Sequence, residues 1–575
     1  MKRIQAIFSM GILYTALLAM CQQQVEASFI GANGGPESEV LMASADSTNV
    51  KQYHATKEDV KSYTRSLDSR KSTTVECGAI VGTLRIQEMK SKLLSSSHIP
   101  SSAAGFSIYL VNHDVQARKI CASCRDAADA AATGNVVWQE YCGESAYGNN
   151  ATVSGLMLVP IDENGDLIEG PLAGHISAHQ SLTETFSQIP SETFDQFDKH
   201  WLSIVAASSG KIAIEPDYLG YGESSNFFKS FLVRPAYATA TIPLWQSAVK
   251  MIAEESSCYS YLKPVVYVAG YGEGAFAALS IADALTSTFN VQIVKASLGG
   301  GPYRLGSLAL PRLVDSINEK KMTADHYYVL ALFASAFSST NSWLANVGYN
   351  QDLLDASYRD RIVGLVQEGG SADSFLESLP PKVTDIIDPR YFSWMKSMAV
   401  QGEYMGCLAG PPIQPDFNGH FCLALLENDL TSVLHDAEYD IDLCHSPDDE
   451  VFHIDNLPPQ LNADITTRNP RLTRQLASGS HDSAYRFCSQ LAITEGLFTN
   501  PRLSPIVECG AKATPQPTLG PATTVPTGTP IVATLTPTPK PTTRVVGITE
   551  QTSSARRLGI GCVWMLLVLS MGLTL

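Results

Sequence analysis

The stretch VVYVAGYGEGAFAALS, residues 265–280, decides the fold. A β-branched and aromatic run leads into a glycine-rich turn, and the turn leads into an Ala- and Leu-rich segment. This order predicts a strand, a sharp turn and a helix. It is typical of the G-x-S-x-G elbow, which holds a nucleophilic serine at the turn. The turn reads Gly-Tyr-Gly-Glu-Gly, so Gly272 stands at the serine position.

Strand-like and helix-like patterns alternate around this stretch. Strand candidates cover residues 154–162, 211–218, 264–270, 294–300 and 439–446, and helical patterns cover 200–209, 241–256 and 274–289. Such alternation predicts an α/β fold with a mostly parallel, doubly wound sheet. About 135 residues separate the last two strand candidates. We expect this segment, about 303–438, to form an inserted helical cap over the carboxyl ends of the strands, the alternative being an extension of the sheet.

The composition fits a folded, secreted protein. The chain has 575 residues, of which 45% are apolar, and a net charge of −17, which disfavours a nucleic-acid partner. Residues 1–27 combine a basic start, an apolar segment and an A-x-A-like exit, and they predict a secretory signal peptide. Residues 28–75 are polar and predict a flexible leader. The globular domain is expected over residues 76–510.

The carboxyl-terminal end predicts a stalk and an anchor. Residues 511–545 hold eleven Thr and eight Pro and no aromatic residue, so we expect a disordered, O-glycosylated stalk over 511–552. Residues 553–575 end in 18 uncharged residues, with Arg556 and Arg557 before them. Basic residues ahead of an apolar end favour a GPI-attachment signal, and a membrane span is the alternative. Either places the protein on the outer face of the plasma membrane or on the cell wall.

The cysteines indicate disulfides. Of the 12 cysteines, Cys21 and Cys562 fall in the signal and the tail, and the remaining ten allow up to five bridges of undetermined pairing. The CASC motif at 121–124 lacks a second ligand pair, which favours a disulfide over a metal or redox site. We therefore predict no metal and no cofactor. Asn150 in the sequon NAT is a predicted glycosylation site.

Candidate acid and base residues follow the elbow in the order that a triad of this type needs. Asp448 and Asp449 come directly after the strand candidate at 439–446. His481 lies in a Gly- and Ser-rich loop farther along the chain. A carboxylate at this place can orient a histidine that acts as general base.

Several stretches together resemble the secreted α/β-hydrolase group that includes fungal secretory lipases and serine-peptidase-like esterases. The stretches are SGLMLVP (154–160), AHQSLTE (178–184), EPDYLGYGESS (215–225), GYGEGAFAA (270–278), GGGPYRLG (299–306), HSPDDEV (445–451) and GSHDSA (479–484). The resemblance covers about Gly155 to Cys488 and implies an α/β-hydrolase fold.

The resemblance also implies roles for single residues. Asp449 would be the triad acid, with Asp448 as the second choice, and His481 the general base. The segment of His179 resembles the His-Gly-Thr turn that supplies one backbone N–H to the oxyanion hole, but Gln180 replaces the glycine here.

The second oxyanion donor would be the backbone N–H of Glu273. The decisive departure is Gly272, because an acyl-enzyme needs an oxygen or sulfur nucleophile. Ser224 and Ser181 are the serines that could stand in for it.

Three functions remain open on this basis. The first is a catalytically impaired hydrolase-fold protein that binds a small hydrophobic ester, lipid or peptide-like ligand. The second is an active hydrolase that uses Asp449 and His481 with another nucleophile or with water. The third is a structural or adhesive surface protein.

Overall fold

A computed structural model describes the part of the chain that carries these motifs. The described residues are 76–123, 151–179, 189–225, 227, 229–255, 260–289, 291–305, 324–340, 355, 357–368, 377, 389, 424–457 and 471–497. All of them belong to one unit, 53–516. The predicted signal peptide, leader, stalk and hydrophobic tail lie outside the described residues, as does Asn150. None of the helices in the described ranges has both the length and the apolar character that a membrane crossing needs.

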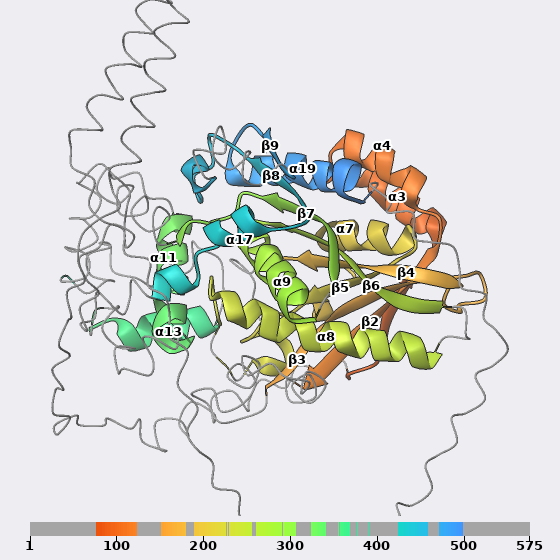
Figure 1. The fold of residues 1–575 in the computed structure, drawn as a ribbon, viewed down its shortest axis with the longest axis horizontal. Coiled ribbons are helices and arrows are strands. Elements are labelled where there is room, and N and C mark those ends of the chain that lie inside the picture. Colours follow the sequence, from red (N-terminus) through yellow and green to blue (C-terminus); the bar gives the residue numbers. More distant parts are fainter. Residues whose placement is uncertain are drawn as a thin grey trace, which may run out of the picture. The chain divides into compact units, whose positions relative to one another are not determined.

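One sheet of nine strands organises the described residues, in the order β1-β2-β3-β5-β4-β6-β7-β8-β9 (Figure 1). The strands are β1 (Ile80–Leu84), β2 (Asp114–Ser123), β3 (Thr152–Ile161), β4 (Gly170–Ala178), β5 (Lys211–Pro216), β6 (Ser260–Tyr271), β7 (Gln292–Gly299), β8 (Asp440–His445) and β9 (Leu472–Leu476). The strands from β5 to β9 along this order run parallel, and β1, β2 and β3 pair in antiparallel fashion. The predicted α/β class with a mostly parallel sheet is confirmed.

Helices connect the strands and cover both faces of the sheet (Figure 1). They are α3 (Ile86–Ser95), α4 (Ser101–Leu110), α7 (Phe197–Ser208), α8 (Arg234–Glu255), α9 (Glu273–Phe289), α11 (Ala324–Thr340), α13 (Arg359–Glu368), α17 (Thr431–Asp436) and α19 (His481–Leu491). The short 3₁₀ helices are η1 (Pro190–Glu192), η2 (Gly222–Ser224) and η6 (Ile454–Asn456), and η8 (Ala492–Leu497) is a π-helix.

The alternation of side chains along the central strands divides most of the described core into two large clusters, beside a smaller one around the Cys444–Cys488 disulfide. Met157 and Val159 of β3 join the larger cluster with helices α8 and α9. Leu156 and Leu158 face the opposite way and join a second cluster with α3, α4 and α7. Because side chains in a strand alternate between faces, a strand buried on both sides shows an unbroken apolar run. That run is what made β3 visible in the sequence.

Strand β4 was missed because its sequence, GPLAGHISA, holds small and polar residues. The strand lies between β5 and β6. A Cβ at Gly174 would lie 2.3 Å from Cζ3 of Trp245, so the large indole on α8 demands the glycine. The neighbouring helix thus explains a residue that lowers strand propensity.

The predicted cap over 303–438 is described only in pieces. Helix α11 and helix α13 lie within it, where helical patterns are visible in the sequence. Most of the other cap residues lie outside the described ranges.

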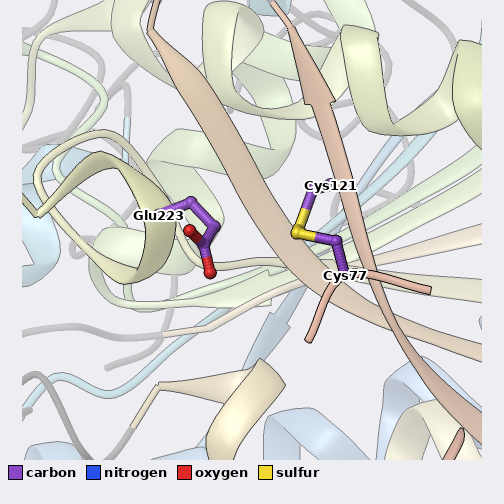
Figure 2. Close-up of side chains that lie close together, drawn as sticks. All are labelled: Cys77, Cys121 and Glu223. Atoms are coloured by element: carbon purple, nitrogen blue, oxygen red, sulfur yellow. A yellow bond between two sulfur atoms is a disulfide. The ribbon is translucent and has the colours of Figure 1, made fainter. Parts of the chain in front are cut away.

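A disulfide joins Cys77 to Cys121 at the start of the described chain, beside the Glu223 carboxylate (Figure 2). These three residues are the one group in the described ranges whose ligand atoms lie close enough together to hold a metal ion. The two sulfur atoms are bonded to each other, so neither can bind a metal as a thiolate. Only the Glu223 carboxylate of this group is left as a metal ligand. Cys121 pairs with Cys77, as the disulfide interpretation of the CASC motif expects.

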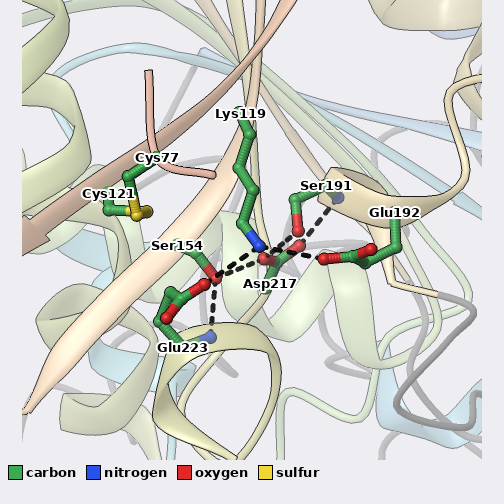
Figure 3. The surroundings of a disulfide bond; sticks show 8 residues. All are labelled: Cys77, Lys119, Cys121, Ser154, Ser191, Glu192, Asp217 and Glu223. Atoms are coloured by element: carbon green, nitrogen blue, oxygen red, sulfur yellow. Dashed lines mark hydrogen bonds and ion pairs between the residues drawn. A yellow bond between two sulfur atoms is a disulfide. The ribbon is translucent and has the colours of Figure 1, made fainter. Parts of the chain in front are cut away.

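Beside this disulfide, a buried polar network fixes the loop after β5 (Figure 3). Lys119 is 1% exposed and its Nζ lies 2.9 Å from Glu192 and 3.0 Å from Glu223. Burial opposes the charge of Lys119, but the hydrogen bonds and the attraction of the two carboxylates outweigh it and raise its pKa. Asp217 accepts hydrogen bonds from the hydroxyls of Ser154 and Ser191, both at 2.6 Å. The network anchors the PDYLGYG loop to β2 and β3.

We predict that Gly270→Ala and Gly274→Ala each destabilise the fold by about 3 kcal/mol through overpacking. A Cβ at Gly270 would lie 2.1 Å from the carbonyl oxygen of Gly274, and a Cβ at Gly274 would lie 2.2 Å from that of Ala178. Urea unfolding measures the change. Gly105→Ala in α4 is the control, because a Cβ there meets no atom within 4 Å, and we expect it to be neutral or stabilising. An unchanged unfolding midpoint for Gly270→Ala would contradict the geometry.

We also predict that His175 on β4 makes stability depend on acid pH. Its ring nitrogens have no hydrogen-bond partner within the described ranges, and burial, with the charge of Lys211, lowers its pKa to about 3 from 6.5. Since the unfolded chain binds more protons in that window, the free energy of unfolding falls as pH drops from 6.5 toward about 3. His175→Leu should flatten this slope in urea unfolding at several pH values. His98→Ala, at an exposed histidine, should leave the slope unchanged.

Candidate active site

The elbow between β6 and α9 has the geometry that its sequence predicts. Gly272 follows the last residue of β6 with φ of 58°, and α9 begins at the next residue. Its N–H donates to the carbonyl oxygen of Gly299 at 2.8 Å. Gly270 and Gly274 on either side are required by the close backbone approach. The turn is therefore a sharp strand-to-helix elbow in which the central position carries no side chain.

The structure brings Asp449 and His481 together. Nδ1 of His481 lies 2.8 Å from Oδ2 of Asp449, and both side chains are buried, at 3% and 0% exposure. The other carboxylate oxygen accepts hydrogen bonds from the backbone N–H groups of Val451 and Phe452. Asp448, the second choice as the acid, is exposed. The carboxylate thus holds the imidazole through Nδ1 and makes no hydrogen bond to Nε2.

Nε2 of His481 is buried and has no hydrogen-bond partner in the part of the chain that the structure describes. The ring packs against the rings of Tyr271 and Phe452. Helix α19 begins at His481, where Ser480 is the N-cap and the His481 N–H donates to Glu450 at 3.0 Å. Aromatic packing and the helix terminus fix the orientation of the imidazole.

Further contacts hold the two segments that carry the acid and the base. His445, at the end of β8, donates from Nε2 to the carbonyl oxygen of Phe452 at 2.6 Å, which closes the loop around Asp449. Burial lowers the pKa of His445 although Asp449 opposes the shift. A disulfide joins Cys444 of β8 to Cys488 of α19. The loop and the helix are therefore tied together by a covalent bond as well as by the Asp449–His481 contact.

The segments proposed for the oxyanion hole are held by two tyrosines. Tyr218 stacks on His179 with ring centroids 4.3 Å apart and donates to its carbonyl oxygen at 3.0 Å. Tyr237 packs edge-on against Tyr218 and donates to the Glu273 carboxylate at 2.7 Å. Gln180 and Ser181 lie outside the described residues. One aromatic pair thus connects His179 with Glu273, which follows Gly272.

Backbone strain gathers around the same tyrosines. Tyr218 and Leu232 have φ of 64° and 55°, and they are the non-glycine residues with positive φ in the described ranges. The N–H of Leu232 donates to the hydroxyl of Tyr237 at 2.9 Å. Strain of this kind persists only where the surroundings enforce it, and it clusters at functional sites. Tyr218 belongs to the quoted stretch EPDYLGYGESS, but no pattern marks its role.

A cavity of about 450 Å³ opens beside the elbow. Its wall includes His179, Gly270, Tyr271 and His481, and it continues along the sheet face beneath α7 and α19. Val329 of α11 contributes to it from the predicted cap. Glu273 does not line it. Of the candidate residues in the described ranges, His179 and His481 line the cavity, whereas Gly272 and Asp449 do not.

A second hydroxyl–imidazole–carboxylate row lines the cavity and was missed in the sequence. His200 Nδ1 lies 2.6 Å from Glu215, and Nε2 lies 2.9 Å from the carbonyl oxygen and 3.1 Å from the hydroxyl of Thr193. Because both ring nitrogens face acceptors, both carry hydrogens, and the imidazolium forms an ion pair with Glu215. Burial raises the pKa of Glu215, but His200 outweighs this and lowers it. The protonated ring cannot serve as a base for Thr193.

Ser224 is a structural residue. It is fully buried, and its hydroxyl lies within hydrogen-bond distance of the carbonyl oxygens of Tyr218 and Tyr221. It does not line the cavity. Its place in the loop after β5 removes it as a replacement nucleophile for His481.

Comparisons with known proteins agree with the fold. No family model matches the chain, and no curated protein matches it. A protein of Legionella pneumophila assigned as a hydrolase has a TM-score of 0.54 at 15% identity, covering 74% of this chain and 98% of its own. A variant of the rice cell wall degrading esterase LipA of Xanthomonas oryzae has a TM-score of 0.49 at 18% identity, covering 74% and 96%. The Legionella likeness and the strand order show the α/β-hydrolase fold.

We predict that the two disulfides contribute similarly to stability and differently to the site. Both close loops of 44 residues, so each should contribute about 4 kcal/mol by restricting the unfolded chain. Replacing Cys444 and Cys488 by serine should also weaken the Asp449–His481 hydrogen bond, because α19 is then released from β8. NMR of the exchange-protected Nδ1–H of His481 measures this. The double variant of Cys77 and Cys121 should keep that resonance. Loss of the resonance in both double variants would show that the Cys444–Cys488 disulfide has no specific effect on the Asp449–His481 hydrogen bond.

Proposed function

We propose that this α/β-hydrolase-fold chain binds a small hydrophobic ester, lipid or peptide-like ligand beside His481 without forming a covalent intermediate. The observation that carries the proposal is Gly272 at the centre of the elbow. An acyl-enzyme needs a nucleophilic oxygen or sulfur, which glycine lacks. The buried Asp449–His481 pair and the cavity support retention of a binding site.

The alternative that an observation favours is hydrolysis by water. Nε2 of His481 has no hydrogen-bond partner among the described residues, and Asp449 can stabilise an imidazolium. Nε2 would take a proton from water as the water oxygen attacks the ester carbonyl. The carbon–oxygen bond to the alcohol would then break, and the alcohol oxygen would receive the proton. Backbone N–H groups near His179 and Glu273 would stabilise the oxyanion, and His481 would act as general base.

We propose in addition that the protein is displayed on the outer cell surface through its carboxyl-terminal tail. The signal-like residues 1–27, the Thr- and Pro-rich stalk and the uncharged final segment support this. Disulfides are typical of secreted proteins. Treating intact cells with a phosphatidylinositol-specific phospholipase should release the protein if the tail is a GPI signal. Retention on the cells would favour a membrane span.

We predict that the purified full-length protein is not labelled by a fluorophosphonate probe and does not hydrolyse short-chain nitrophenyl esters through a covalent intermediate. Gly272→Ser should be labelled and should gain activity by about 10³-fold or more, because a triad acts as a unit. Gly272→Ser combined with His481→Ala is the control that should lose this gain.

Labelling of the parent protein would contradict the proposal. Ester hydrolysis by the unlabelled parent that disappears in His481→Ala would favour the water mechanism. A folded protein with neither ligand binding nor activity, also in Gly272→Ser, would favour the structural or adhesive function.

A further inference from the structure

We propose that the cavity takes an uncharged lipid with a hydroxyl group, and that this group binds to Ser297 on the floor of the cavity. The inference rests on the proposed binding function and specifies the class and the position of its ligand. This position is separate from the elbow, since neither Gly272 nor Asp449 lines the cavity.

Three neighbouring strands form the floor of the cavity with small side chains. Ser177 of β4 lies opposite Ala269 of β6, and Ala269 lies opposite Ser297 of β7; all three line the cavity. Their neighbours along each strand belong to the core cluster with α8 and α9: Ile176, Val268 and Leu298. Because side chains in a strand alternate between faces, the three small side chains face the other side, toward α7 and α19. They leave space that large side chains would fill in a packed interior.

Ser297 carries the polar group of the floor that lacks a partner. The residue is 8% exposed, and its hydroxyl makes no hydrogen bond to any described residue. Asp442, its neighbour on β8, is already engaged by Lys295 and Thr473. The Ser297 oxygen is not one of the fully enclosed unpartnered atoms of the described chain, which include Nε2 of His481. Its hydroxyl is therefore a group that the cavity can present to a ligand.

The charges of the wall disfavour an ionic ligand. Oε2 of Glu215 lies 2.6 Å from Nδ1 of His200, and Oδ2 of Asp442 lies 2.6 Å from Nζ of Lys295. Solvent reaches and screens the other lysine and carboxylate side chains of the wall: Lys199, Glu450 and Asp482. An ion on the floor would lose its hydration without gaining an unpaired opposite charge. An uncharged ligand avoids this cost.

Among uncharged groups, a hydroxyl fits the floor best. The Ser297 hydroxyl can donate one hydrogen bond and can also accept, and a ligand hydroxyl can do the same. An ester has acceptor oxygens only, and its carbonyl oxygen would bring negative partial charge beside the Asp442 carboxylate. A ligand hydroxyl can accept from Ser297 while its own hydrogen points to that carboxylate.

The rest of the wall fits an alkyl chain. It includes Leu202 of α7, Leu491 of α19, Ala492 of η8 and the Cys444–Cys488 disulfide. The cavity volume of about 450 Å³ lies within the range of about 300–1,000 Å³ that is typical of small-ligand sites. Each methylene buried there strengthens binding by about 4-fold. A medium-chain alcohol is the simplest probe with this combination of groups.

Titration calorimetry on the purified full-length protein tests the inference with 1-octanol, methyl octanoate, octanoate and octylammonium. We expect 1-octanol to bind about 5-fold more tightly than the ester and at least about 10-fold more tightly than either ion. Ser297→Ala should weaken 1-octanol binding by about 5-fold, because one hydrogen bond is lost. Ser101→Ala, at an exposed serine outside the cavity, should leave it unchanged.

A cavity-filling variant and a spectrum of the parent protein test the position. Ala269→Leu places a large side chain in the middle of the floor, so we expect it to weaken 1-octanol binding by about 10-fold or more. Urea unfolding checks that this variant keeps its fold. In the NMR spectrum of the parent, 1-octanol should shift the methyl resonance of Ala269. The methyl resonance of Ala103, which is buried in α4 outside the cavity, should stay unchanged.

The outcomes separate this inference from the proposed function. Equal affinity for 1-octanol and octanoate, absence of 1-octanol binding, or full affinity in Ser297→Ala would overturn the inference. An unlabelled parent that binds the ester would still support the proposed function in each of these cases. Binding of 1-octanol that depends on Ser297, by a parent that the fluorophosphonate labels, would support the inference and refute the proposed function.

Discussion

The close approach of backbone atoms at the end of β6 is the constraint on which the site depends. The turn brings Gly270 against Gly274 and Gly274 against Ala178, at distances that exclude any side chain. This contact fixes where α9 begins and how near it lies to the end of β4. The amino end of α9, His179 and the cavity acquire their positions from it. Gly270 and Gly274 are required by these contacts, whereas Gly272, between them, is the nucleophile position. A change of residue at Gly272 can therefore remove the nucleophile and leave the fold intact.

The rest of the site can keep its structure although Gly272 carries no nucleophile. Asp449 accepts two backbone hydrogen bonds that shape its own loop, besides the contact with His481. Removing either partner would leave a buried polar group without compensation, which is destabilising. Retention of the pair therefore follows from stability as much as from catalysis. Nε2 of His481 differs from Nδ1, because it makes no hydrogen bond to any described residue. A ligand or a water molecule would be needed to give it a partner.

The sequence predicted the parts of the fold that local patterns determine. The unbroken apolar run of β3 and the strand–turn–helix pattern around Gly272 were read correctly, because burial on both faces and a glycine-rich turn leave local signatures. Strand β4 was missed because Gly174 is required by its packing against Trp245, a residue distant in sequence. Asp449 and His481 could be predicted from order and loop context. The row from Thr193 through His200 to Glu215 could not, since a charged pair buried between a helix and a strand has no local pattern.

The two histidines of the cavity show what a ring nitrogen needs in order to react. In His200 both nitrogens face fixed acceptors, so the ring holds two hydrogens and its charge is balanced by Glu215. In His481 only Nδ1 faces an acceptor, and Nε2 is buried without a hydrogen-bond partner among the described residues. The same side chain is therefore a fixed cation in one place and an open proton acceptor in the other. The difference lies in one backbone carbonyl, that of Thr193, which has no counterpart at His481 among the described residues.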